Sequence, residues 1–96
     1  MQFMNIVKFK VKPERVSDFL DAMRNQPHWE GNIEMRVVQT GDHTFCGCGL
    51  WESKEIMLAS MEDMVAWLDT IRPMLDVISE SLGVTDPASG PVIIQK

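Results

Sequence analysis

The sequence of 96 residues contains no tyrosine, two cysteines and two histidines. The absence of tyrosine excludes a proton relay through a phenol of the protein. Cys46 and Cys48 are separated by one glycine and point to the same face of a regular strand, where an ordinary disulfide is difficult to close. A structural zinc site usually takes four ligands. We therefore expect two small buried residues, no metal, and a reducing cytoplasm as the simplest location.

Positive charge is also scarce, because 9 Lys and Arg face 14 Asp and Glu, for a net charge of -5. The longest basic pattern is the alternation of Lys8, Lys10 and Lys12, which argues against nucleic acid and against an anionic membrane surface as partners. No apolar run approaches the roughly 20 residues that span a bilayer. The start, residues 1–5, lacks a basic segment followed by an apolar one, so we expect no signal peptide. The sequence holds no Gly-rich phosphate loop, nucleophile elbow or His–Glu metal motif on a helix.

The chain length predicts one domain covering residues 1–96. Its first strand is predicted over Phe3–Val11, where one face carries apolar residues interrupted by Asn5. Met4 and Ile6 begin the other face with apolar side chains, so this strand should be central. Pro13 should open a helix, and the buried stripe of that helix is Val16, Phe19, Leu20 and Met23.

A hairpin should follow, because apolar and polar residues alternate over residues 33–37 and Gly41-Asp42 indicates a turn. The return strand, His43–Glu52, contains Gly47 and Gly49. Two glycines weaken a strand unless something approaches closely. Either a helix packs tightly over them, or a ligand uses the vacant space.

The second helical region is predicted as a short helix near Ser53–Ala59 and a main helix from about Met61 to Leu82, with Ser60 as its N-cap. Pro73 should kink the main helix. Arg72 could bind an anionic substrate group, but an ion-pair ladder that joins Asp69, Arg72 and Asp76 explains it adequately. Residues 84–90 are expected to form a loop by composition. A last short strand is expected over Pro91–Gln95.

The order strand, helix, strand, strand, helix, strand predicts an α+β fold of the ferredoxin-like, split βαβ type. Its four-stranded antiparallel sheet would carry both helices on one face. The other face is partly apolar, so we expect a second copy of the chain to cover it as a homodimer.

This layout, with Trp51-Glu52-Ser53 at the end of the third strand and Gly90-Pro91-Val92-Ile93 at the last one, resembles the dimeric α/β-barrel superfamily. More narrowly, it is similar to the antibiotic biosynthesis monooxygenase family and its uncharacterised bacterial relatives. The resemblance implies oxidation of polycyclic phenols to quinones by dioxygen, without metal or bound flavin, in a pocket between sheet and helices.

Haem-degrading relatives use an Asn from the first strand and a Trp and a His from the second helical region. The resemblance therefore places Asn5 in the first of these roles, and Trp67 lies on the matching helix. The distance along the chain from Trp51 to Trp67 is longer than the family pattern, and no histidine follows Trp67. Both departures argue against haem degradation.

The candidate residues each admit two interpretations. Asn5 is either a structural hydrogen-bonding partner or a donor to a substrate oxygen. Trp67 either walls a flat ligand or packs in the core or the dimer interface. Phe45 and Trp51 flank the two glycines and could wall a ligand, but tight packing explains them equally well. The eight methionines, with Met64 as the candidate, line an adaptable pocket or simply fill the core.

His43 and His28 are the only side chains that titrate near neutrality without perturbation, and both are expected in turns or loops. The leading hypothesis is a cofactor-independent monooxygenase-like protein for a small flat phenol. In it Asn5 stabilises the reacting oxygen, His43 or His28 moves a proton, and Phe45, Trp51, Met64 and Trp67 hold the ring. The alternatives are a non-catalytic dimeric module, with or without a small apolar ligand, and a lyase or isomerase.

Overall fold

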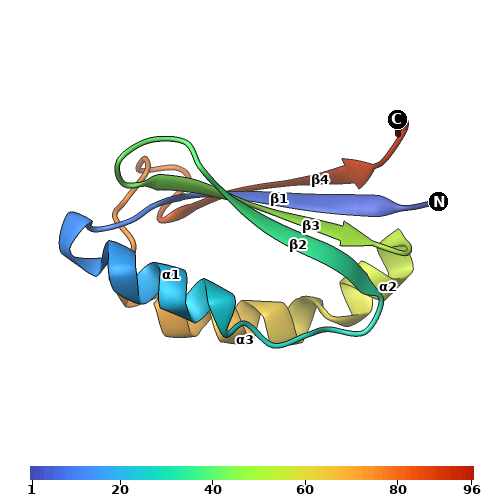
Figure 1. Cartoon of the computed structure of the whole chain (residues 1–96), viewed down its shortest axis with the longest axis horizontal. Coiled ribbons are helices and arrows are strands. Elements are labelled where there is room, and N and C mark those ends of the chain that lie inside the picture. The colour runs from blue at the N-terminus through green and yellow to red at the C-terminus, as the bar shows by residue number, and fades with distance from the viewer.

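A computed structural model describes all residues from Met1 to Lys96. One four-stranded antiparallel sheet has the strand order β2-β3-β1-β4. The strands are β1 (Phe3–Lys10), β2 (Asn32–Gln39), β3 (Thr44–Trp51) and β4 (Thr85–Pro91). The helices lie together beneath one face of this sheet (Figure 1). The predicted α+β ferredoxin-like fold is confirmed, including the central position of the first strand.

The helical elements are α1 (Val16–Arg24), α2 (Lys54–Ala59) and α3 (Met61–Ile71), with 3-10 turns η1 (Pro13–Arg15) and η2 (Arg72–Met74). Pro13 opens the first helical segment as predicted, since its missing N–H costs nothing at a helix start. The Ser53 side chain caps α2 by accepting a hydrogen bond from the Ile56 N–H. No helix is both long enough and apolar enough to cross a membrane.

The prediction that the main helix continues to Leu82 is wrong. The α-helix ends at Ile71, and Pro73 lies in η2, where the helix stops instead of kinking. Leu75 is already extended and pairs with Val11 beyond the end of β1. Ser60 is the N-cap residue of α3 as predicted, but its side chain makes no capping hydrogen bond, because its backbone is helical at the end of α2.

The predicted position of the last strand is also wrong. Residues 85–91 form β4 and pair with β1, whereas the expected strand begins only where β4 ends. Pro87 is tolerated because β4 is an edge strand with a neighbour on one side only. The exposed Ile93 and Ile94 lie beyond the sheet.

The core consists of two clusters. The larger one joins the inner face of the sheet to α1, to the end of α3 and to the segment after it, through Phe9, Val11, Phe19, Met23, Phe45, Ile71 and Leu75. Its rings pack closely, with centroids 5.4 Å apart for Phe9–Phe19 and 5.1 Å for Phe19–Phe45. The smaller cluster is Phe3, Trp51 and Met57, at the α2 end. The sheet and the helical layer are therefore packed together at two separate clusters.

Candidate functional site

A cavity of about 460 Å³, here called the inner chamber, lies between the helix-facing side of the sheet and α3. All four strands contribute to it. Its walls include Asn5, Gly49, Trp51, Met64, Trp67 and Ser89. This volume is within the range of small-molecule sites in proteins, roughly 300–1,000 Å³.

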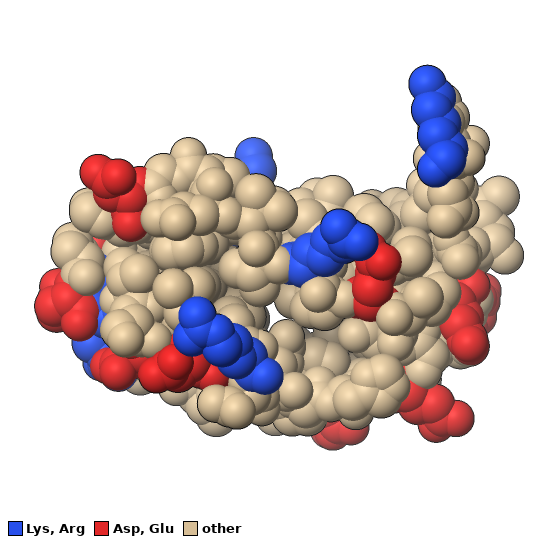
Figure 2. Space-filling view, viewed as in Figure 1, with Lys and Arg blue, Asp and Glu red and all other residues tan.

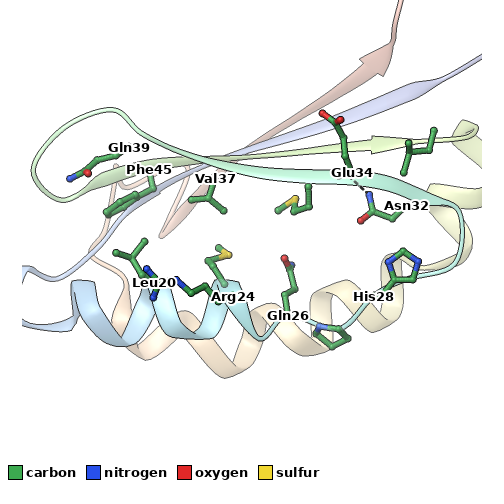
Figure 3. A pocket seen from close by; sticks show the side chains of 13 residues that line it. Leu20, Arg24, Gln26, His28, Asn32, Glu34, Val37, Gln39 and Phe45 are labelled. Atoms are coloured by element: carbon green, nitrogen blue, oxygen red, sulfur yellow. Dashed lines mark hydrogen bonds between the residues drawn. The ribbon is translucent and has the colours of Figure 1, made fainter.

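A second cavity of about 630 Å³, the outer groove, opens at the β2 edge of the sheet between β2 and the end of α1. Figure 3 shows its lining side chains. The outer groove and the inner chamber share Met23, Gln26, Asn32 and Met35 as lining residues. The space-filling view shows an opening between the two layers (Figure 2). The two cavities thus form one passage from the β2 edge to β4.

The Asn5 amide has a fixed orientation in the inner chamber. The Trp51 indole Nε1–H donates a hydrogen bond of 2.7 Å to Asn5 Oδ1. An indole N–H can only donate, so the amide oxygen must face Trp51. The Asn5 Nδ2 group forms no hydrogen bond with the protein and is not sealed from the cavity. The site therefore presents two N–H donors to an occupant.

The two glycines of β3 are explained by side chains of the neighbouring strands. A Cβ on Gly49 would overlap Asn5 Oδ1 and lie 3.1 Å from Trp51 Nε1. A Cβ on Gly47 would lie 3.2 Å from Met35 Cε and 3.5 Å from a carbon of the Phe9 ring. The absent side chain at position 49 therefore makes room for the Asn5–Trp51 pair, and both glycines also line the inner chamber.

Two more amides, those of Gln26 and Asn32, line both cavities. Gln26 rises from the segment after α1, and Asn32 descends from the start of β2 (Figure 3). Asn32 Nδ2 donates to the carbonyl oxygens of Glu34 at 3.1 Å and Leu50 at 3.0 Å. Its Oδ1 stays available as an acceptor, and Gln26 makes no side-chain hydrogen bond within the protein.

The inner chamber contains no Asp or Glu, and Arg72 is the only charged residue in its wall. Arg72 Nε donates to Asp69 Oδ1 at 2.7 Å. The expected partner Asp76 does not complete the ladder, because the chain leaves the helix after Ile71. The Asp76 N–H instead donates to the Lys10 carbonyl oxygen at 2.7 Å.

Aromatic and thioether groups supply the apolar surface of the inner chamber. All three tryptophans of the chain line it, and the rings of Trp29 and Trp67 meet edge to face with centroids 6.3 Å apart. Five of the eight methionines also line it, namely Met23, Met35, Met57, Met61 and Met64. Such a wall adapts readily to the shape of a flat ligand.

The structure brings together four of the six predicted site residues. Asn5, Trp51, Met64 and Trp67 all line the inner chamber. Phe45 borders the outer groove and is packed in the core against Phe19.

The structure does not bring either histidine into the inner chamber. His43 is exposed between β2 and β3 and lines neither cavity. The catalytic role predicted for it has no geometric support. His28 is exposed at the outer groove.

Sequence reasoning missed Gln26, Asn32 and Ser89. For Arg72 it weighed the binding of an anionic substrate group and preferred ion pairing. Gln26 stands before Pro27 in a loop, where an exposed polar residue is the ordinary expectation. Ser89 lies in a segment whose composition indicates a loop. No local pattern in the sequence marks these residues as part of a site.

The two cysteines lie on the sheet face away from the helices, opposite Lys8 and Ile6 of β1. Their Sγ atoms are 3.9 Å apart, and both thiols are free. Burial raises the pKa of the Cys48 thiol, and the neighbouring Cys46 thiol adds to the shift. No three His, Cys, Asp or Glu side chains gather where they could hold a metal ion.

No protein-family model and no curated protein matches this chain. Solved structures do match it over nearly its whole length. A candidate antibiotic biosynthesis monooxygenase from Chloroflexus aurantiacus superposes with a TM-score of 0.75 at 13% identity, covering 100% of this chain and 97% of that one. The chain has the fold of the antibiotic biosynthesis monooxygenase-like proteins.

Two further structures extend this similarity of fold. SnoaB, a cofactor-independent oxygenase from Streptomyces nogalater, matches with a TM-score of 0.72 at 8% identity, covering 98% of this chain and 95% of that one. A dimeric ferredoxin-like protein from an uncultured marine organism matches with a TM-score of 0.73 at 12% identity, covering 99% and 90%. The fold suggested by the sequence resemblance is thereby confirmed.

Proposed function

We propose that this protein is a cofactor-independent monooxygenase that oxidises a small flat phenol in the inner chamber. In such a reaction one oxygen atom of O₂ enters the ring and the other leaves as water. The phenol is oxidised to a quinone and supplies all four electrons. The proposal draws on the fold shared with SnoaB, a cofactor-independent oxygenase, and on the contents of the chamber.

The observation that carries the proposal is the Asn5 amide. Its oxygen is anchored by Trp51, and its Nδ2 group faces a largely apolar cavity. A phenolate oxygen placed against this group would accept an N–H hydrogen bond in surroundings of low dielectric, where such bonds are strong. Stabilising the phenolate makes the ring electron-rich and favours electron transfer to O₂.

No Asp, Glu, His or Lys lines the chamber, so it contains no side chain that could accept the proton of the phenol. The phenol therefore loses its proton to water or to a group at the mouth of the passage, such as His28 in the outer groove. We leave His43 out of the reaction because it borders neither cavity.

Oxygen consumption with hydroxynaphthalenes and hydroxyanthracenes tests the function. We expect the wild type to consume O₂ with at least one of them, and Asn5→Ala to lose about tenfold or more of kcat, as when one oxyanion donor is removed. Asn25→Ala is the matched control, because Asn25 is exposed and binds only the Asp21 carbonyl oxygen. Equal activity of Asn5→Ala and wild type would overturn the role of Asn5.

The absence of an internal acid or base favours a second candidate, a non-catalytic module that binds a flat ligand. It predicts ligand binding without oxygen consumption for every phenol tested. The same measurements therefore separate the two candidates.

We also propose that the 96 residues act as one domain and pair as a homodimer through the sheet face away from the helices. All four strands share one sheet, and that face carries the apolar residues Ile6, Val38 and Ala88 around the two cysteines. A protein of the same fold is described as dimeric.

A further inference from the structure

We propose that the occupant of the inner chamber is an elongated fused-ring phenol that bears a carboxylate at the end opposite its hydroxyl group. Arg72 binds the carboxylate, and Asn5 binds the phenol oxygen. This inference rests on the proposed function for the phenol and deepens it by naming the acid group and its position.

The distribution of charged residues around the inner chamber favours an anionic ligand. The protein has a net charge of -5, yet no carboxylate of the protein lines the inner chamber, and its one charged residue is the cation Arg72. An anionic ligand therefore meets no like charge inside the chamber. A neutral ligand would leave this arginine without a partner among the atoms of the ligand.

The hydrogen bonding of the Arg72 guanidinium also supports a carboxylate as its ligand. Asp69 holds only its Nε, at 2.7 Å, and the Arg72 side chain is 40% exposed. No other hydrogen bond of the protein uses its two terminal nitrogens. A guanidinium fixed at Nε presents these nitrogens as a pair, a geometry that matches the two oxygens of a carboxylate.

The pairing of β1 with β4 gives the distance between the two ends of the chamber and therefore the length of the ligand. Asn5 lies opposite Ser89, whereas Phe9 lies opposite Thr85, and both Ser89 and Thr85 line the chamber. Leu75 pairs with Val11 just beyond Phe9, so Arg72 lies near the Phe9–Thr85 end. Four residues of strand separate the two ends by roughly 13 Å.

A span of this size suits a fused-ring system with its polar groups at opposite ends. The suitable probe is 6-hydroxy-2-naphthoate, which has this arrangement. Its methyl ester removes the charge, and 3-hydroxy-2-naphthoate places both groups at the same end. Titration calorimetry with the intact chain at neutral pH gives the three affinities.

We expect 6-hydroxy-2-naphthoate to bind about tenfold or more tightly than either comparison compound, as for a charge-assisted pair. Energy transfer from tryptophan to the bound naphthoate gives a second readout of binding, because all three tryptophans line the chamber. Equal binding of the acid and its ester would overturn the inference without relying on any variant.

The variant Arg72→Gln should lose this preference for the acid over the ester, and Arg72→Lys should keep part of it. The control Arg24→Gln removes a positive charge from the outer groove and should leave the preference within about twofold. An equal loss in both arginine variants would indicate a general charge effect and would contradict a specific role of Arg72.

The two proposals fail in different ways. Binding that depends on the acid and on Arg72, without oxygen consumption, would support the ligand class and refute the monooxygenase function. Oxygen consumption with the ester or with 2-naphthol, at rates equal to those with the acid, would keep the function and refute the ligand class.

Discussion

Gly49 is the residue on which the geometry of the amide site depends. Its missing side chain leaves the space that Asn5 Oδ1 and the Trp51 indole share. The same strand pairs with β1 and β2 along its whole length, so the backbone has little freedom to move away. Any side chain at position 49 must displace the hydrogen-bonded pair.

We expect Gly49→Ala to lower the free energy of unfolding by about 1–3 kcal/mol, as overpacking does. It should also reduce the affinity for phenols, because the Asn5 amide is displaced. Gly90→Ala is the matched control, since nothing lies within 4 Å of a Cβ there. Urea unfolding of both variants is the measurement, and equal stabilities would contradict the described contact.

The thiol of Cys48 leads to a prediction about alkaline pH. Its pKa is raised by burial and by Cys46, so the folded state favours the protonated form. The contribution of the Cys48 thiol to the free energy of unfolding is fully present below the pKa of the unfolded thiol. It is lost as the pH rises through the higher pKa of the folded state. The free energy of unfolding should therefore fall with rising pH in this range, and less steeply in Cys48→Ser.

Thiolate absorbance in the ultraviolet checks the same shift directly, and the absence of tyrosine removes the usual overlapping signal. A titration midpoint below the ordinary range of a cysteine would contradict the raised pKa.

At the residue scale, the sequence predicted the parts of the site that interrupt a pattern. Asn5 was identified because it breaks an apolar strand face, and Trp51 because it follows two glycines. Gln26 and Arg72 join the site through the packing of distant elements, and no spacing within the chain encodes that placement. Arg72 also had a sufficient local explanation in Asp69.

Among the elements, the segment after Pro73 differs most from its sequence pattern. Its apolar residues keep helical spacing, so a helix to Leu82 predicts that Leu75 and Leu82, seven residues apart, share one buried face. In the structure Leu75 is 3% exposed and Leu82 is 44% exposed. The helix ends at the proline, and the backbone that follows pairs with the end of β1, with the Asp76 N–H donating to the Lys10 carbonyl oxygen at 2.7 Å.

We expect Leu75→Ala to lower the free energy of unfolding by about 2–5 kcal/mol, the usual cost of truncating a buried leucine. Leu82→Ala should change it by less than about 0.5 kcal/mol, as for surface substitutions. Chemical denaturation of the pair distinguishes the two arrangements, because comparable losses would support the continuous helix.

The order of elements was predictable because hydrophobic period, proline and turn signals agree over most of the chain. The end of α3 and the position of β4 were not, for a shared physical reason. Edge pairing with β1 satisfies the backbone of residues 85–91 even though their side chains are typical of a loop. Beyond β4 only the Val92 N–H still donates to this side of the sheet, to the Gln2 carbonyl oxygen at 3.0 Å, and Ile93 and Ile94 are exposed.

For the whole molecule, the central prediction concerns the sheet face without helices. Ile6 lies at its centre, between Cys48 and Ala88. If two copies meet there, Ile6→Glu places one carboxylate from each copy in the apolar centre of the interface and should yield a monomer, because removing a charge from water is costly. Sedimentation equilibrium gives the mass.

Val77→Glu is the control for the added charge, because Val77 is 61% exposed and lies outside the sheet. It should leave the dimer intact. A wild-type protein that sediments as a monomer would refute the proposed assembly, and a dimer that persists in Ile6→Glu would place the interface elsewhere.

The passage between the two layers has a kinetic consequence. An aromatic molecule held between Asn5 and Arg72 would occupy the β4 side, while the outer groove still leads inward from the β2 edge. Dioxygen could then arrive behind a substrate already in place, with no need to enter first. Because the substrate and dioxygen can enter from opposite sides, either can bind first, and the rate law should show random addition of the two reactants.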